Sequence, residues 1–567
     1  MKASLLLAGA AALALLSCAG TPPPGRILSP GQWTGTPIVT TRFGMVGGIE
    51  DADGTYLWRA IPYAKPPVGD LRWRAPQDPE PWAGVRTPGA FNAGCTQPNP
   101  LNVTGIGGSE DCLYLNVWRP RDAETRLPVY VWIHGGGNSV GSATMVTDWY
   151  GSRVASRSHM VFVSMNYRLG PFGWFTTPAL RDGSTPEDAS GNYGTLDIIK
   201  SLQWIRDNIE AFGGDPANVT VTGESAGGFN VLSLLIALPA AGLFQRALSE
   251  SGSATTHGVD EADARSRGVI NQLLVQAGRA RTPAEADSLA ALMSSAELNA
   301  FLRSRTDRQI LRCYPRGAFG IMIDNPALIR DGAVLPADGF DVLSRGAYPN
   351  KVPVILGTNK EEGKLFLAFS STLSWKSDLY AAVARYTSER WKVSGVDEVA
   401  RRLAANTDQP PVYAYRFDWG APDQQGASPL PGSWGKRLGA FHSSDVPFFL
   451  GTDTLDGGLQ ILLYTKTNEP GRKALSAAMM DYAAQFARTG NPNRPGSLLP
   501  EWKAWTNEPG VDKLIVFDAR GDAVAIKMTN MELTDDGVLA DAKSLAEPLR
   551  SQVLTALDQA HMPAGAR

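Results

Sequence analysis

Two continuous apolar runs in the first third of the chain indicate buried β-strands. Residues 127–133 (LPVYVWI) and 160–165 (MVFVSM) are rich in β-forming side chains and do not alternate between apolar and polar positions. A strand that is apolar on both faces belongs in the interior of a parallel sheet, where helices cover both sides. The pattern therefore predicts a parallel sheet enclosed between two layers of helices.

The chain continues with an alternation of strand-like and helix-like segments. The pattern favours a helix over 196–212 and strands over 352–356 and 412–417. This alternation is typical of a doubly wound α/β fold with a large, mostly parallel central sheet flanked by helices. Residues 258–345 and 365–406 have a mainly helical pattern, so we expect helical insertions there that cap the sheet and shape the site.

The N-terminus has the pattern of an export signal. One lysine is followed by an apolar run that ends in LLSC at Cys18, which is typical of a signal peptide rather than a transmembrane helix. LLSC resembles a bacterial lipobox, so we expect Cys18 to become the lipidated first residue of the mature protein. Ordinary cleavage after Ala19 is the alternative. The expected location is the periplasm, the outer membrane as a lipoprotein, or the extracellular space.

Four segments are expected along the chain. A signal peptide covers 1–18, a linker rich in proline and glycine covers 19–36, one catalytic domain covers 37–550 and a tail covers 551–567. A single domain of this length is unusual, but folds built on one large sheet often run long. Within the domain, residues 37–117 have the pattern of short antiparallel strands at one edge of the sheet.

Composition and charge exclude several classes of partner. The formal net charge is -3 and no basic block occurs, so nothing favours binding to nucleic acid. Beyond the N-terminal run, no apolar stretch reaches membrane-spanning length. The four cysteines and five histidines include no CxxC and no closely spaced histidine pair, so we expect no metal site and no cofactor. Cys95 and Cys112 enclose a polar loop of an exported chain, which predicts a disulfide and leaves Cys313 unpaired.

Ser225 has the sequence context of a nucleophile. It lies in GESAG (223–227), between an apolar strand-like run at 219–221 and an apolar helix-like segment. A serine on a sharp strand-to-helix turn needs neighbours without side chains, and the two glycines meet that need. A second GxSxG match contains Ser139 but has no apolar strand directly before it and no helix-forming run after it, so we interpret Ser139 as a loop serine.

A run of three glycines supplies the second feature of such a site. HGGG begins at His134, directly after the run at 127–133, and glycines at a strand end let backbone N–H groups approach a bound carbonyl oxygen. We therefore predict an oxyanion hole formed by Gly136, Gly137 and Ala226, the last being the residue after the candidate nucleophile.

The base is expected among the histidines that follow Ser225, because the chain order in this arrangement is serine, acid, histidine. His442, in a loop between small and aromatic residues, is the candidate, and His257 and His561 are expected at the surface. The acid should end a strand between the two. Glu361 and Glu362 both lie just after the run at 352–356, and the pattern alone does not choose between them.

The ordered set of motifs resembles the type-B carboxylesterases, relatives of the cholinesterases within the α/β hydrolases. The resemblance covers roughly residues 37–506. The motifs that carry it are IPYAKPPVGDLRWRAP, SEDCLYLNVW, WIHGGG, NYRLGPFGW, GNYGTLDIIKSLQWIRDNIEAFGGDP, GESAGG, KEEG, ARTGNPN and EWKAW. The resemblance implies that the acid is Glu362, the carboxylate directly before Gly363, and that Glu224 and Asp445 support the site.

The same resemblance implies three structural links. These are the Cys95–Cys112 disulfide and two ion pairs, Arg72 with Glu110 and Arg168 with Asp197. The activity it implies is hydrolysis of carboxylic esters through an acyl-enzyme, with a small-molecule ester as the partner.

Three departures from the family pattern bear on the substrate. The loop between the paired cysteines contains no tryptophan, so choline esters are not expected and broad small-to-medium esters are. Asn138 stands where the family commonly has an aromatic residue, and no bulky aromatic follows Ser253. A lipase or amidase specificity is the alternative. A non-catalytic adhesion protein of this superfamily is a remote one, because such proteins have lost the nucleophile or the histidine.

Overall fold

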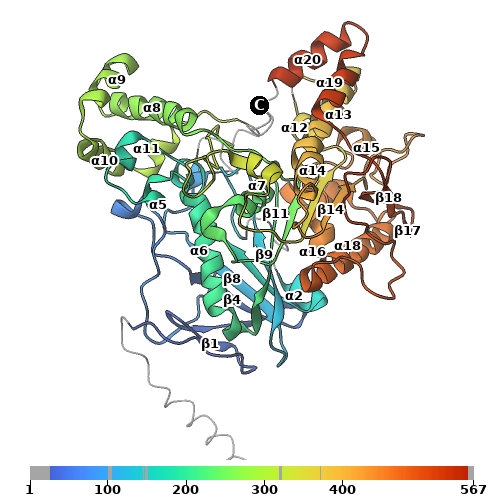
Figure 1. The fold of residues 1–567 in the computed structure, drawn as a ribbon, viewed down its shortest axis with the longest axis horizontal. Helices are drawn as coiled ribbons and strands as arrows, with labels where there is room; N and C mark the ends of the chain where they lie inside the picture. Colours follow the sequence, from blue (N-terminus) through green and yellow to red (C-terminus); the bar gives the residue numbers. More distant parts are fainter. Residues whose placement is uncertain are drawn as a thin grey trace, which may run out of the picture.

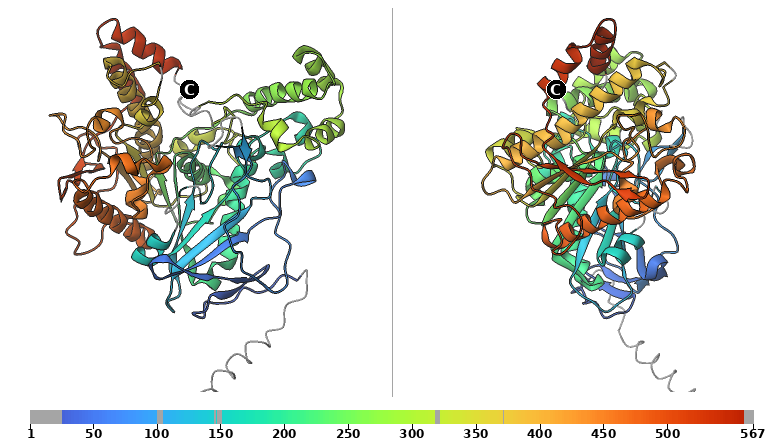
Figure 2. Two further views of the ribbon diagram at one scale, coloured as in Figure 1. Left: turned by 180° about the vertical axis from the view of Figure 1, so that it is seen from behind. Right: turned by 90° about the vertical axis from the view of Figure 1, so that its right-hand side faces the viewer.

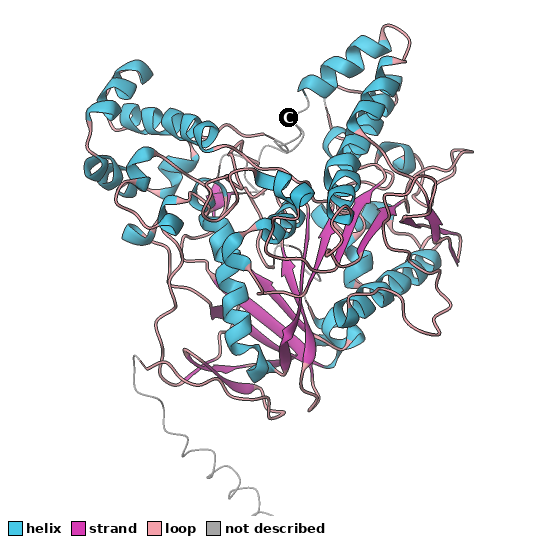
Figure 3. Ribbon diagram, in the orientation of Figure 1, coloured by secondary structure: helices cyan, strands magenta, loops and turns pink. Residues whose placement is uncertain are grey.

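One large sheet runs through the molecule (Figure 3). The computed structural model describes residues 26–99, 105–144, 146, 151–317, 322–370 and 372–559. Within these residues the sheet has eleven strands in the order β18-β15-β14-β13-β12-β11-β9-β10-β8-β4-β3. The strands from β15 through β10 run parallel, and antiparallel strands close both edges. This is the doubly wound α/β architecture predicted from the pattern, in the α/β-hydrolase form that the resemblance implies.

The strands of the large sheet have the following bounds, in chain order: β3 Ile49–Asp51, β4 Thr55–Pro62, β8 Tyr114–Pro120, β9 Leu127–Ile133, β10 Val161–Met165, β11 Gly214–Glu224, β12 Arg246–Glu250, β13 Val354–Asn359, β14 Val412–Phe417, β15 Leu514–Phe517 and β18 Lys527–Thr529. Of the predicted strands, 127–133 and 412–417 coincide with β9 and β14. For the run at 160–165, the observed strand β10 begins one residue later, at Val161.

The side chains of β9 show why that run is apolar without alternation. Val129, Val131 and Ile133 pack with the helices α6 (Tyr193–Asn208) and α7 (Ala226–Ile236) on one face of the sheet. Tyr130 and Trp132 pack on the opposite face with α2 (Ser152–Ser158) and α18 (Glu469–Thr489). Both faces are covered, so burial of apolar area on each side stabilises the strand.

Two groups of helices lie beyond one end of the sheet, on either side of α7 (Figure 1). The first group is α8 Val259–Gln276, α9 Pro283–Leu292, α10 Ser295–Arg303 and α11 Asp307–Leu311. The second is α12 Gly363–Leu367, α13 Asp378–Lys392, α14 Glu398–Ala404, α19 Asp535–Lys543 and α20 Leu549–Gln559. Figure 2 shows the same two groups from behind and from the side. The helical insertions expected from the pattern are therefore present, but the described residues of 312–338 contain no helix.

Three predictions need correction: those for the edge strands, the N-terminal linker and the C-terminal tail. The strands β1 (Ile38–Thr41) and β2 (Gly44–Gly47) form a small separate sheet with β5 (Val85–Arg86) and do not extend the edge of the large one. Within the linker expected over 19–36, Trp33 is buried and its Nε1 donates to the carbonyl oxygen of Asp122, 3.0 Å away.

The tail expected from residue 551 begins, in its described part, within α20. Val553 and Leu557 of that helix are buried against α13. Burial of apolar side chains explains both departures from a free terminal segment, because Trp33 and the apolar face of α20 each cover a patch of the body.

The covalent and ionic links implied by the resemblance are confirmed. Cys95 and Cys112 form a disulfide, and Cys313 is free and buried. Arg72 Nε lies 2.6 Å from Glu110 Oε2, and Arg168 Nε lies 2.7 Å from Asp197 Oδ2. Arg168 and Asp197 are almost fully buried, where such pairs hold geometry more than they add stability.

The predicted signal peptide, Cys18 and His561 lie outside the described residues. Over the part of the chain that is described, no helix has the length and apolar character needed to cross a membrane. The same part contains no group of three His, Cys, Asp or Glu side chains arranged to hold a metal ion.

Candidate active site

Ser225 occupies a sharp turn between β11 and α7. Its φ of 57° lies in the left-handed region, which non-glycine residues rarely adopt. A Cβ on Gly223 would come within 2.6 Å of the backbone of Gly227, and one on Gly227 within 2.0 Å of the Ile133 carbonyl oxygen. Only glycine fits at these two positions, as the GESAG pattern predicted. The strained turn directs the serine side chain away from both elements.

His442 and Glu362 meet beside this turn. His442 lies in the loop before α16 (Val446–Leu450), and its Nδ1 is 2.5 Å from Glu362 Oε2. Glu362 is fully buried and is the last residue of the short loop between β13 and α12. Between the two carboxylates that the sequence left open, the structure brings Glu362 to the histidine. Glu361 instead forms an ion pair with Lys364, 2.6 Å away.

Three donors fix the Glu362 carboxylate. Oε1 accepts hydrogen bonds from Ser251 Oγ at 2.6 Å, from Thr358 Oγ1 at 2.8 Å and from the backbone N–H of Asn359 at 2.6 Å. Burial alone raises the pKa of this carboxyl, but the charge and hydrogen bond of His442, followed by these donors, lower it below its ordinary value. Glu362 therefore stays ionised with its second oxygen on the imidazole.

The other ring nitrogen of His442 faces Glu224. Nε2 lies 3.1 Å from Glu224 Oε1, and that oxygen also accepts from Ser443 Oγ at 2.6 Å. Burial lowers the pKa of His442 by itself, but the charges of Glu224 and Glu362 outweigh it and raise this pKa to about 9. Burial raises the pKa of Glu224 to about 7 against the opposing charge of His442. The buried imidazole is thus held between two carboxylates.

Asp445 supports the acid without contacting the histidine ring. Its carboxylate accepts from Tyr415 Oη at 2.6 Å and from Asn359 Nδ2 at 2.9 Å. Asn359 in turn donates its backbone N–H to Glu362. Burial raises the pKa of Asp445 to about 6. Glu224, in contrast, touches His442 directly.

The three amides predicted for the oxyanion hole are free. Among the described residues, no acceptor takes the backbone N–H of Gly136, Gly137 or Ala226. Gly136 has a φ of 104° and Gly137 a φ of 62°, and a Cβ on Gly136 would come within 2.1 Å of the Val140 carbonyl oxygen. Ala226 is the first residue of α7, where the N–H groups have no partner within the helix and the helix dipole is positive.

An apolar cavity of about 370 Å³ connects these elements. Ser225, His442, Glu224 and Gly136 line it. The remaining wall is mostly aromatic and aliphatic: Trp132, His134, Gly135, Val140, Ser142, Ala143, Val146, Met322, Leu365, Phe366, Phe369, Phe441, Ser443, Gly457 and Leu459. A pocket with apolar walls and a few convergent polar groups is the usual form of a small-molecule site.

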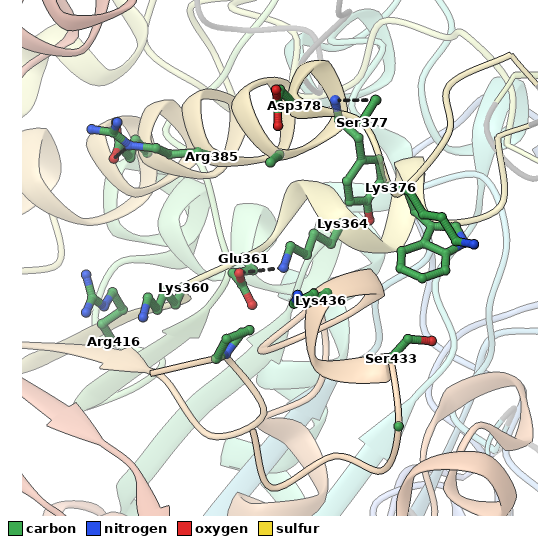
Figure 4. Close-up of a pocket in the computed structure, with 16 residues that line it drawn as sticks. Lys360, Glu361, Lys364, Lys376, Ser377, Asp378, Arg385, Arg416, Ser433 and Lys436 are labelled. Atoms are coloured by element: carbon green, nitrogen blue, oxygen red, sulfur yellow. Dashed lines mark hydrogen bonds and ion pairs between the residues drawn. The ribbon is translucent and has the colours of Figure 1, made fainter. Parts of the chain in front are cut away.

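A second, charged cavity of about 890 Å³ lies on the other side of the segment 360–369 (Figure 4). Six cationic and three acidic side chains line it: Lys360, Lys364, Lys376, Arg385, Arg416, Lys436, Glu361, Asp378 and Glu389. Ser377 and Ser433 also reach it, but no histidine is among its described lining residues. The segment thus turns Leu365 and Phe366 to the apolar cavity and Lys360 and Lys364 to the charged one.

Several contacts of the site had no signal in the sequence. The His442 ring packs beside the stacked rings of Trp391 and Phe366, with ring centroids 4.8 and 5.3 Å away. Trp391 Nε1 donates to the Ser251 carbonyl oxygen at 3.0 Å, and Ser251 holds Glu362. These partners come from segments far apart in the chain.

His257 does not lie at the surface as expected. It is 8% exposed, because its backbone pairs with the segment that contains Leu328 and Ile329. Its Nδ1 lies 2.9 Å from Glu261 Oε1, within the same helical region. No contact joins it to Ser225 in the described part of the chain.

Known proteins are similar to this chain over most of its length, not only at the site. A sequence model described as the carboxylesterase family matches residues 35–377 and 373–532. The chain is 35% identical over 496 residues to a para-nitrobenzyl esterase of Bacillus subtilis, covering 83% of this chain and 94% of the relative. It is 32% identical over 547 residues to carboxylesterase 1D of Rattus norvegicus, covering 84% and 89%.

Solved structures match the fold over a similar length. A structure of PNB esterase superposes with a TM-score of 0.64 at 30% identity, covering 87% of this chain and 98% of the other. A carboxylesterase of Geobacillus stearothermophilus gives a TM-score of 0.64 at 31% identity, also covering 87% and 98%. The family match therefore spans the large sheet, the helices from α2 through α18 and the residues that line the apolar cavity, and it ends before α19 and α20.

Proposed function

Because this chain belongs to the carboxylesterase family and is a serine hydrolase that acts on ester bonds, we propose that Ser225, His442 and Glu362 perform the reaction. The observation that carries these assignments is the buried Nδ1–Oε2 contact of 2.5 Å beside the strained turn of Ser225. Nucleophile, base and orienting acid are the three roles that serine ester hydrolysis requires.

The first half of the reaction forms the acyl-enzyme. Ser225 Oγ attacks the ester carbonyl carbon while His442 Nε2 takes its proton, and Glu362 stabilises the imidazolium through Nδ1. The carbonyl oxygen becomes an oxyanion and accepts hydrogen bonds from the free amides of Gly136, Gly137 and Ala226. The C–O bond to the alcohol then breaks, and the alcohol leaves with the proton from Nε2. Each amide aimed at the oxyanion contributes about 2.7–4 kcal/mol of transition-state stabilisation.

The second half regenerates the serine. Water enters the site of the departed alcohol, His442 Nε2 takes one of its protons, and the resulting hydroxyl attacks the acyl carbon. The second tetrahedral intermediate collapses, Ser225 Oγ recovers the proton from Nε2, and the carboxylic acid is released. Nε2 must be unprotonated for either attack, so the contact with Glu224 makes the reaction depend on pH.

The substrates are small-to-medium esters with an apolar acyl group. The cavity of about 370 Å³ and its aromatic and aliphatic walls support this size and polarity. Choline esters are excluded on sequence grounds, since the loop between Cys95 and Cys112 contains no tryptophan to bind a quaternary ammonium.

Replacement of the nucleophile tests both the site and the substrate class. On p-nitrophenyl esters of increasing acyl length, Ser225→Ala should lower kcat by about 10⁴–10⁶ at every length. Wild-type kcat/KM should peak at short to medium chains and exceed that of the matched anilides and of butyrylcholine. Activity of the variant within tenfold of wild type would falsify the nucleophile assignment, and a peak at long-chain esters would make the protein a lipase.

The chain is exported and anchored by lipid at Cys18. The apolar run that ends in LLSC supports this, together with the Cys95–Cys112 disulfide, which forms in oxidising compartments. Cys18→Ala should move the esterase from the membrane fraction to the soluble fraction of an expressing bacterium. An unchanged distribution contradicts the anchor.

A further inference from the structure

The amides proposed to bind the oxyanion come from two separate segments. Gly136 and Gly137 follow β9, whereas Ala226 begins α7, about 90 residues further along the chain. Oxyanion stabilisation depends on donors held at fixed positions before the reaction, so a contact must set the distance between the two segments.

A buried pair of amide side chains makes that contact. Asn230 Nδ2 on α7 donates to Asn138 Oδ1 at a distance of 3.0 Å. Asn138 directly follows Gly137 and is 6% exposed, and Asn230 lies one helical turn after Ala226 and is 1% exposed. The bond therefore joins the next residue of the glycine loop to the first turn of the nucleophile helix.

The glycine loop needs such an anchor because its glycines leave the backbone free to adopt other conformations. Gly136, Gly137 and Asn138 have φ values of 104°, 62° and 51°, so three successive residues lie in the left-handed region. Asparagine tolerates this conformation better than most residues with a side chain. The Asn138 carbonyl oxygen also accepts the N–H of Gly170 at 2.6 Å, which ties the same residue to the segment before α6. Asn138 is thus fixed from two sides.

We propose that the Asn138–Asn230 amide pair positions the oxyanion loop against the nucleophile helix. Neither side chain has a proton-transfer role, and both act through the backbone amides of Gly136, Gly137 and Ala226. The inference rests on the proposed catalytic site and adds positioning residues to it.

The variants Asn138→Gly and Asn230→Ala remove one partner each, and the double variant removes both. Asn138→Gly keeps a residue that adopts the left-handed conformation. Ser233→Ala is the matched control, since Ser233 is also buried on α7 and donates from Oγ to the Asn230 carbonyl oxygen at 2.7 Å without reaching the glycine loop. Thermal melting of each variant separates loss of folding from loss of positioning.

Two measurements distinguish a positioning role of the pair from a general structural effect of the substitutions. The first is kcat and KM on a p-nitrophenyl ester, and the second is the affinity for a trifluoromethyl ketone, which forms a tetrahedral adduct with an oxyanion. In each single variant, kcat and the ketone affinity should fall together by about 10–100-fold, less than the 10²–10³-fold cost of losing one donor outright. KM should stay within about threefold, because the substrate carbonyl develops its charge only in the transition state.

The double variant supplies a further criterion. If the two amides act as one unit, the double variant loses no more than either single variant, whereas independent roles would multiply their effects. Should Asn230→Ala fail to fold, Asn138→Gly leaves α7 unchanged and carries the same expectation.

The experiment distinguishes failure of the proposed catalytic site from failure of the positioning pair. Ketone binding that persists in Ser225→Ala contradicts the proposed site and this inference with it. Ketone binding that depends on Ser225 but is as strong in Asn138→Gly and Asn230→Ala as in Ser233→Ala contradicts the positioning pair alone. Equal changes of kcat in Asn230→Ala and Ser233→Ala lead to the same conclusion.

Discussion

The chain contains the pattern GxSxG twice, and both serines are buried but have very different surroundings. Ser139 Oγ donates to the carbonyl oxygen of Gly137 and reaches that of Ile323, 3.0 and 3.2 Å away, and it accepts the Ile323 N–H at 3.3 Å. Ser225 Oγ has no hydrogen-bond partner among the described residues and faces the cavity that His442 also lines. The hydroxyl of Ser139 holds the pocket wall next to Met322, whereas that of Ser225 is free to react.

The backbone conformations around Ser225 and Ser139 also differ. Ser225 has a left-handed φ between a parallel strand and a helix, which leaves its side chain at the tip of a turn. Ser139 lies in a tight turn closed by its own N–H to the Gly136 carbonyl oxygen, 3.1 Å away. A five-residue pattern therefore identifies a nucleophile only together with the strand before it, the helix after it and the groups that face its side chain.

Among the groups that distinguish Ser225 from Ser139, Glu362 should give the largest change in kcat when it is replaced. Glu362→Gln should lower kcat on a p-nitrophenyl ester by about 10⁴-fold, because an amide can donate to Nδ1 and favour the wrong histidine tautomer. The folded state should remain, since the Ser251, Thr358 and Asn359 donors still have an amide oxygen to bind. Glu361→Gln is the neighbouring control and should change kcat by less than about threefold, since Glu361 faces the charged cavity and pairs with Lys364, not with His442. Equal losses in the two variants would erase the distinction between the carboxylates.

The charge of Glu224 gives a smaller and pH-dependent effect. Glu224 raises the pKa of His442 to about 9 together with Glu362, and only the neutral imidazole accepts the Ser225 proton, so activity rises as pH increases through that pKa. Glu224→Gln removes one of the three carboxylate charges that raise this pKa, those of Glu224, Glu362 and Asp445, so the acid limb of the kcat/KM profile should move to lower pH by about 1 unit or more. A profile that stays in place, or moves to higher pH, would show that Glu224 does not act on the histidine through its charge. Ser139→Ala should leave the profile unmoved.

The sequence predicted those features that depend on local pattern. The runs at 127–133 and 412–417 gave β9 and β14 with their correct bounds, because strands covered on both faces are mostly apolar. The run at 352–356 gave β13 two residues too early, because Pro353 has no N–H for the ladder. The same strand continues through the polar residues Thr358 and Asn359, which end the apolar pattern. Thr358 Oγ1 and the backbone N–H of Asn359 donate to Glu362, and the Asn359 side chain donates to Asp445.

Contacts between distant segments could not be predicted from the residues. Trp391 reaches the Ser251 carbonyl oxygen across 140 positions, and Ser251 reaches Glu362 across 111. No periodicity encodes such pairs, since each depends on how α13 and the strand ends pack. The choice between Glu361 and Glu362 could not be made from the residues for the same reason, because it depends on which carboxylate lies against His442 and which faces the charged cavity.

The most direct test of the difference between Ser225 and Ser139 is the site of a covalent organophosphonate, determined by a crystal structure of the treated protein. The adduct should lie on Ser225 Oγ, with its phosphoryl oxygen in hydrogen-bond range of the Gly136, Gly137 and Ala226 amides. Ser139→Ala should be labelled as fast as wild type and Ser225→Ala not at all. An adduct on Ser139, or a phosphoryl oxygen turned away from the three amides, would contradict the catalytic site described above.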